Sequence, residues 1–168
     1  GYPPFRKKAK LYVEQSNHLD TDKWYHQSHL YEIGVCATGT RAVMYDFARM
    51  LMEQKKAGEK ITLITMAPGW GYDGLFSSIG YDIEYIPLRP EMGFEPDSDA
   101  IIYVLQSVAR KGKAVLALNP QHNPTGINWS WETLKKIIDQ AVDLDIALLI
   151  DNAYYQIHAP SIKVSSGL

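Results

Sequence analysis

Two motifs in this sequence place polar side chains directly after apolar runs. Asp151 follows a run of five apolar residues and opens the tetrapeptide Asp151 to Tyr154. A carboxylate in that place is costly to desolvate unless a cation pairs with it, although a helix cap or an ordinary ion pair would also explain it. The octapeptide Asn119 to Gly126 follows another apolar run and holds two Asn-Pro pairs. Its prolines fix the backbone, so Asn123 could be aimed at a ligand; a purely structural tight loop is the alternative.

Two further motifs could supply a phosphate site and a ring contact. Thr38, Gly39 and Thr40 come just before a helical pattern. The glycine lets the backbone approach a ligand closely, and hydroxyls with free amide hydrogens at a helix start can bind phosphate. A simple helix cap by either threonine is the alternative. Trp70 lies between two glycines near the end of an apolar run, where its indole could stack on a planar ring or only cap the core.

Together the four motifs describe a pocket with a phosphate cradle, a stacking ring, an aimed amide and an acid that needs a positive partner. Pyridoxal 5'-phosphate needs that combination of groups. Its phosphate suits a helix start, its ring suits an aromatic face, and its pyridinium nitrogen suits a carboxylate. The sequence therefore predicts a pyridoxal-phosphate site, provided that the four motifs meet in space.

Alternating strand and helix patterns would bring these motifs together. We expect a short strand or extended entry over 31–37, strands within 61–88 and at 114–118 and 146–150, and helices between them, the last beginning after an N-cap at Ser130. This order predicts a three-layer α/β/α fold with a mostly parallel sheet, in which ligands bind beyond the carboxyl ends of the strands. The run 146–150 is apolar at every position, which predicts a strand covered on both faces.

The composition argues against several other classes of protein. The chain has 168 residues, a net charge of -2, 46% apolar residues and one cysteine. This charge gives no footprint for nucleic acid or an anionic membrane, and no apolar stretch approaches the roughly 20 residues that span a bilayer. One cysteine excludes a disulfide framework and a four-thiolate zinc site, and we expect no metal site of another kind. We expect a soluble, cytoplasmic chain.

At these motifs the sequence resembles the fold-type I pyridoxal-phosphate enzymes, specifically the class I/II aminotransferases of the aspartate aminotransferase superfamily. The resemblance runs from about Ile33 to Tyr155. The segment Asn123 to Gly126 matches the Asn-Pro-Thr-Gly loop of that family, and Asp151 to Tyr154 matches its Asp-x-Ala-Tyr signature. The two motifs begin 28 residues apart (151 minus 123), which is also the family's separation.

The resemblance implies a role for each motif. Asn123 and Tyr154 would donate hydrogen bonds to the phenolic oxygen of pyridoxal 5'-phosphate, and Asp151 would pair with its pyridinium nitrogen. Asp151 and Tyr154 are thus the implied catalytic residues in this chain. Trp70 takes the place of the ring-stacking aromatic residue. The family's phosphate loop is replaced by Thr38, Gly39 and Thr40.

The resemblance also implies an organisation and partners. We expect an N-terminal segment over 1–30 and part of the cofactor-binding large domain over 31–168, without the C-terminal small domain. An amino acid and a keto acid would be the substrates, and the enzyme would be a homodimer. The aromatic residues Trp24, Tyr25 and Tyr31 could belong to the dimer contact, although a pocket rim or a satellite of the core explains them as well.

The chain departs from the family at the lysine that binds the cofactor covalently. That lysine lies a few tens of residues beyond the aspartate in the family, whereas Lys163 follows Asp151 by 12 residues (163 minus 151). The interval is too short for the intervening loop and strand, so a solvated surface lysine is the preferred interpretation of Lys163. We therefore expect the chain to be the cofactor-binding portion of a longer aminotransferase, unable by itself to complete transamination.

Two other functions remain open. A fold-type I enzyme of another outcome, such as a lyase, a decarboxylase, or an amino-acid oxidase or hydroxylase, would share the same pocket, and nothing in these residues separates it from an aminotransferase. A binding or regulatory module could keep the pocket without the lysine. That module would bind the cofactor without covalent attachment.

Overall fold

The computed structural model describes residues 1–17, 31–155 and 157. They divide into two compact units, one from Gly1 to Asp46 and one from Phe47 onward. The boundary expected between residues 30 and 31 falls at the edge of an undescribed stretch and stays a prediction. Lys163, Trp24 and Tyr25 lie outside the described residues.

The first unit contains helix α1 (Pro3–Ser16) and the segment that follows residue 30. Prolines in its first turn suit a helix start, because the N–H groups there have no partner within the helix. Arg6 donates from Nε to the carbonyl of Ile33 and forms an ion pair with Glu32, while the ammonium of Lys10 lies over the ring of Tyr31. These contacts hold the segment along α1. It forms no strand with the other described residues, so the expectation for 31–37 holds only as an entry to the next helix.

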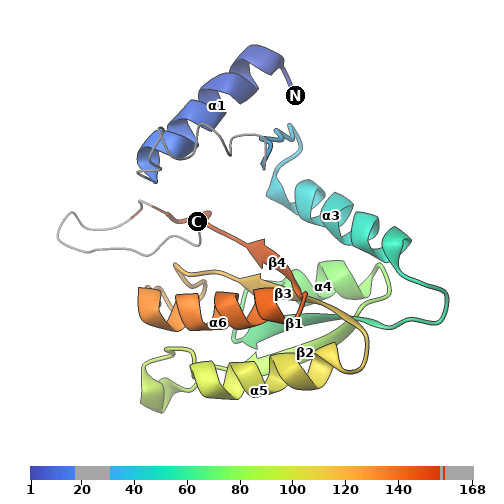
Figure 1. The fold of residues 1–168 in the computed structure, drawn as a ribbon. Coiled ribbons are helices and arrows are strands. Elements are labelled where there is room, and N and C mark those ends of the chain that lie inside the picture. Colours follow the sequence, from blue (N-terminus) through green and yellow to red (C-terminus); the bar gives the residue numbers. More distant parts are fainter. Residues whose placement is uncertain (18–30, 156, 158–168) are drawn as a thin grey trace. The chain divides into compact units, whose positions relative to one another are not determined.

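The second unit is built on a sheet of four parallel strands in the order β2-β1-β3-β4 (Figure 1). Their bounds are β1 (Ile61–Ala67), β2 (Asp82–Pro87), β3 (Lys113–Leu118) and β4 (Ala147–Ile150). The prediction of a parallel sheet is confirmed. Parallel neighbours need crossover connections, and helices supply them.

Helices cover both faces of the sheet. They are α4 (Tyr72–Ser77), α5 (Ser98–Ala109) and α6 (Trp131–Asp143). The chain also forms α3 (Thr40–Gln54), which begins in the first unit, and a short 3-10 turn η2 (Pro90–Met92). Helices α5 and α6 pack on each other and on one face, whereas α4 packs on β1 and β2 at the other face (Figure 1). The α/β fold with flanking helices is therefore confirmed. No helix in the described part of the chain is long and apolar enough to cross a membrane.

The main core lies between the sheet and the α5–α6 layer, because alternate residues of a strand point to opposite faces. Its strand residues include Ile64 and Leu116, which are fully buried, and its helix residues include Leu105 and Ile137. The residues of β1 and β3 are mostly buried on both faces. The prediction that the run 146–150 is covered on both faces is wrong: every residue of β4 is partly exposed, because β4 ends the strand order of the described sheet.

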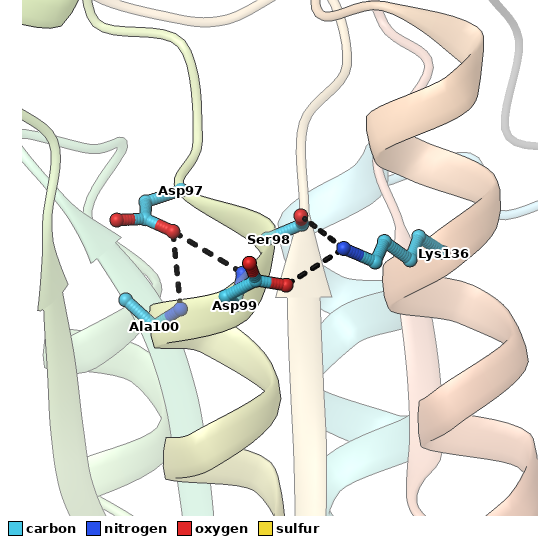
Figure 2. Close-up of polar contacts among 5 residues, drawn as sticks. All are labelled: Asp97, Ser98, Asp99, Ala100 and Lys136. Atoms are coloured by element: carbon cyan, nitrogen blue, oxygen red, sulfur yellow. Dashed lines mark hydrogen bonds and ion pairs between the residues drawn. The ribbon is translucent and has the colours of Figure 1, made fainter.

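Exposed polar groups fix the ends of the two layer helices (Figure 2). The Asp97 carboxylate caps α5 by accepting hydrogen bonds from the backbone N–H groups of Asp99 and Ala100. Lys136 of α6 donates to the Asp99 carboxylate at 2.6 Å and so joins the two helices. The expected N-cap at Ser130 is confirmed, because its hydroxyl accepts a hydrogen bond from a backbone N–H in the first turn of α6.

Candidate cofactor site

The carboxyl ends of β3 and β4 hold two predicted motifs side by side. Leu118 pairs with Ile150 in the register of these strands, so the residues that follow them leave the sheet together. The backbone N–H of Asp151 donates to the carbonyl of Leu118 at 2.8 Å, and the side-chain amide of Asn119 donates to the carbonyl of Asp151 at 2.7 Å. The loop with Asn123 therefore starts beside the loop with Asp151.

Asn119 also holds the loop after β3 in shape. Its side-chain oxygen accepts a hydrogen bond of 2.8 Å from the backbone N–H of Asn123, and its side chain is buried. At the far side of the loop, the N–H of Gly126 donates to the carbonyl of His122, with φ of 74° at the glycine, a conformation that favours that residue. Asn123 is thus fixed by a residue to which sequence reasoning assigned no role of its own.

Asn123 and Tyr154 meet across the two loops. The Nδ2 of Asn123 donates to the hydroxyl oxygen of Tyr154 at 3.0 Å, although the two residues lie 31 apart in the sequence. The amide keeps a second N–H, and a phenol that accepts a hydrogen bond still has its own O–H to donate. Both groups are partly exposed, so two donors remain available side by side for one negatively charged acceptor.

The carboxylate of Asp151 is held by two donors. The hydroxyl of Tyr72 donates to Oδ2 at 2.7 Å, and the backbone N–H of Ala153 donates to Oδ1 at 3.1 Å. A carboxylate offers about four acceptor positions, so acceptor capacity remains for a cation. Burial, and then the hydrogen bond to Asp151, raise the pKa of Tyr72 above its ordinary value, so this group stays a phenol and a donor.

Trp70 contacts Tyr72, and Tyr72 in turn donates to the Asp151 carboxylate. The rings of Trp70 and Tyr72 meet edge to face, with centroids 5.0 Å apart and an angle of 62° between their planes. Sequence reasoning missed Tyr72. The one sequence signal was its position two residues after Trp70, in the connection that leaves the carboxyl end of β1.

A hollow of about 330 Å³ lies beside the Asn123–Tyr154 pair. Its lining residues are Gln121, His122, Asn123, Pro124, Gly126, Asn128, Tyr154 and Ile157. Trp70 and Asp151 are not among them. His122 is buried, stacks on Trp129 and forms a hydrogen bond through Nδ1 with the hydroxyl of Thr125.

The residues predicted to hold phosphate belong to the first unit. Gly39 has φ of 92°, which favours glycine, and α3 starts at the next residue. The hydroxyl of Thr38 lies 3.0 Å from the sulfur of Cys36. The part that Thr38, Gly39 and Thr40 play in a common site stays a prediction, whereas the structure links Trp70, Asn123, Asp151 and Tyr154 within the second unit.

Two solved structures with a similar fold are named as aminotransferases. The aminotransferase AspB from Helicobacter pylori 26695 matches with a TM-score of 0.62 over 76% of this chain and 32% of its own, at 23% identity. The aspartate aminotransferase from Thermus thermophilus with maleate matches with a TM-score of 0.54 over 66% of this chain and 27% of its own, at 26% identity. The chain therefore has the fold of part of an aminotransferase.

The chain belongs to the family described as aminotransferase class I and II, whose model matches residues 34–165. This family is dependent on pyridoxal phosphate. Among curated relatives, an LL-diaminopimelate aminotransferase from Aquifex aeolicus is 35% identical over 48% of this chain, and a probable aspartate/prephenate aminotransferase from Thermus aquaticus is 26% identical over 92%. The chain spans 20% and 36% of the length of these two relatives.

Proposed function

We propose that the chain is the cofactor-binding part of a pyridoxal-phosphate-dependent aminotransferase, which moves an amino group from an amino acid to a keto acid. The observation that carries this proposal is the meeting of two kinds of polar group at neighbouring strand ends. A carboxylate with free acceptor positions, Asp151, comes from one loop, and an amide–phenol donor pair, Asn123 and Tyr154, joins that loop to the next. Membership of the family supports the same reaction.

The chemistry of these groups fits pyridoxal 5'-phosphate. Its protonated ring nitrogen needs an anionic acceptor, which Asp151 would supply. Its phenolic oxygen needs donors, which Asn123 and Tyr154 would supply, and its ring needs an aromatic face, which Trp70 would supply. We assign the phosphate to the segment from Thr38 to Thr40.

Each residue would contribute to the reaction in a distinct way. When bound, pyridoxal 5'-phosphate supplies an electron-poor ring that can accept the negative charge formed at the substrate's α-carbon. Asp151 would hold the proton on the ring nitrogen, because its carboxylate favours the charged form of that nitrogen. Asn123 and Tyr154 would orient the ring through its oxygen, and Trp70 would keep water from one face. In this proposal Lys163 stays a solvated surface lysine, and covalent attachment through it is the less favoured alternative.

Another reaction at the same pocket is the second candidate. A capreomycidine synthase from Streptomyces vinaceus is 31% identical over 56% of this chain, so the relatives are not all named as aminotransferases. Analysis of products from a candidate amino donor, with and without a keto acid acceptor, separates the two. Transamination requires the acceptor and consumes it, whereas a lyase or decarboxylase does not. A homodimer and a cytoplasmic location remain parts of the main proposal.

The binding proposal is tested by titrating the full chain with pyridoxal 5'-phosphate and following the absorbance of the ligand. We expect Asp151→Asn to weaken binding by about tenfold or more, because a hydrogen-bonded charge pair is lost. Asp73→Asn is the matched control, since the Asp73 carboxylate also accepts a hydrogen bond from a tyrosine but lies outside the proposed site. Equal affinities of the two variants would show that Asp151 does not hold the ligand.

Two further measurements test the rest of the proposal. Reduction with borohydride followed by mass measurement reports whether a lysine of the chain binds the cofactor covalently; an added mass would exclude a lysine-less binding module. Thr40→Val is expected to weaken pyridoxal 5'-phosphate but not pyridoxal, because only the former carries the phosphate. The same loss for both ligands would contradict the role assigned to this segment.

A further inference from the structure

One buried side chain touches two of the residues that would hold the cofactor ring. Tyr72, at the start of α4, is 3% exposed. Its hydroxyl lies 2.7 Å from Oδ2 of Asp151, a residue 79 positions further along the chain. The ring of Tyr72 also contacts the ring of Trp70 edge to face. Tyr72 therefore joins the loop after β1 to the loop after β4.

We propose that Tyr72 is a positioning residue that orients the Asp151 carboxylate for the ring nitrogen of pyridoxal 5'-phosphate. This inference rests on the proposed function, because it assumes that Asp151 contacts that nitrogen. Tyr72 itself contacts neither substrate nor reacting atoms in this proposal. It acts through Asp151.

The geometry supports a fixed orientation of this carboxylate. A carboxylate on a short side chain can rotate about its last bond, and one donor leaves that rotation partly free. Here Tyr72 holds Oδ2 and the N–H of Ala153 holds Oδ1, so donors grip both oxygens. Asn119 fixes the backbone carbonyl of the same aspartate. Three contacts thus set the direction of the acceptor positions that remain.

The phenol of Tyr72 is the donor in its hydrogen bond with this carboxylate. An ionised carboxylate accepts hydrogen bonds and offers none. Burial raises the pKa of Tyr72, and the carboxylate of Asp151 and, least, the phenol of Tyr154 raise it further. The donor therefore persists at every pH at which the protein is handled.

A comparison of two ligands tests this role. The probes are pyridoxal 5'-phosphate and an analogue with C–H in place of the ring nitrogen, which cannot pair with Asp151. In Tyr72→Phe the ring stays against Trp70 but the donor is lost. We expect affinity for pyridoxal 5'-phosphate to fall about tenfold and affinity for the carbon analogue to stay unchanged. The ratio of the two affinities does not depend on the fraction of folded protein, because that fraction scales both equally.

Two matched variants control for the loss of a tyrosine hydroxyl. Tyr85→Phe removes an exposed hydroxyl that donates to the Asp73 carboxylate at 2.8 Å. Tyr81→Phe removes a buried hydroxyl that donates to the backbone carbonyl of Ala48. Neither variant should change the affinity ratio. If Tyr72→Phe weakens both ligands equally, the role of Tyr72 is structural alone. If it weakens neither ligand, Tyr72 has no role in binding. Both results leave the affinity ratio unchanged, and both overturn the proposal.

A double-mutant cycle with Asp151→Asn separates failure of this inference from failure of the proposed function. If Tyr72 acts through Asp151, Tyr72→Phe should cause no further loss of ratio once Asp151 is replaced. A further loss in the double variant would contradict the inference. If the unmodified chain already binds both ligands equally, Asp151 does not contact the ring nitrogen, and the proposed function fails together with the inference. If it prefers pyridoxal 5'-phosphate and Tyr72→Phe keeps that preference, only the inference fails.

Discussion

Two tyrosine–carboxylate hydrogen bonds of almost equal length lie in different parts of the second unit. Tyr72 donates to Asp151 at 2.7 Å from a buried position, across 79 residues of sequence. Tyr85 donates to Asp73 at 2.8 Å from a half-exposed position, across 12 residues. Water can replace the partner of the exposed pair, whereas a buried group that loses its partner keeps the full cost of desolvation. The same two groups therefore matter far more at the strand ends than on the surface.

A similar difference separates the carboxyl edge of the sheet from the α5–α6 layer. At the carboxyl edge of the sheet, Asn119 makes two hydrogen bonds that fix the loops after β3 and β4. In the α5–α6 layer, the charged groups of Asp97 and Lys136 are exposed, and they cap or join helices whose apolar faces already pack together (Figure 2). Polar groups hold the first region in shape, whereas apolar packing holds the second.

The largest effect that tests this comparison is expected for Asn119→Ala. The variant removes both side-chain hydrogen bonds of Asn119 and leaves the carbonyl of Asp151 and the N–H of Asn123 without these partners. We expect the free energy of unfolding to fall by about 2 to 4 kcal/mol, because each partly buried group loses its compensation for desolvation. Denaturation in guanidinium chloride, followed by circular dichroism, measures this change.

Lys136→Ala is the matched control from the layer. It also removes two hydrogen bonds, to Asp99 and Ser98, but from an exposed position. The expected loss is below about 1 kcal/mol, since water and salt screen exposed ion pairs. Equal losses for the two variants would remove the distinction between the regions.

Local signals in the sequence predicted much of the layer and part of the site. Apolar runs identified the strands, and Ser130 was recognisable as a cap because a cap depends on its nearest neighbours. Asn123 and Asp151 stood out because each belongs to a short unusual motif. Tyr72 and Asn119 could not be assigned to Asp151, because Asp151 lies 79 and 32 residues away from them and only the folded sheet brings these residues together. The partial exposure of β4 was missed because strand order decides it, and an apolar run does not reveal strand order.

A smaller effect is expected for Asp97→Ala in the layer. The variant removes the cap of α5 and an exposed ion pair with Arg89. Loss of such a cap lowers the free energy of unfolding by about 1 kcal/mol. Affinity for pyridoxal 5'-phosphate should not change, because α5 supplies none of the residues assigned to the site. The control is Asp97→Asn, which keeps a capping oxygen and should retain most of the stability. A loss as large as that for Asn119→Ala would reverse the order expected for the two regions.

The smallest effect concerns pH and the buried His122 at the carboxyl edge. Burial lowers the pKa of His122 below its ordinary value of 6.5, while a hydrogen bond with the backbone of Pro68 acts in the opposite direction. The unfolded chain therefore binds this proton more readily than the folded chain. The stability contributed by neutral His122 is present above pH 6.5 and is lost as pH falls through the lower folded-state pKa. Because the two influences on the pKa oppose each other, we expect this loss to be smaller than that caused by removing the Asp97 cap.

The pH effect can be isolated with His122→Gln, measured by denaturation from about pH 8 to about pH 5. Acidic residues titrate in both proteins, so their contribution appears in both curves and cancels in the difference. The free energy of unfolding of the unmodified chain should fall more steeply below pH 6.5, and the two curves should approach each other toward acid pH. Parallel curves would show that His122 titrates alike in the folded and unfolded chains. In that case burial at the strand ends would make the hydrogen bonds of Asn119 and Tyr72 more important for stability, but it would not change the protonation of His122.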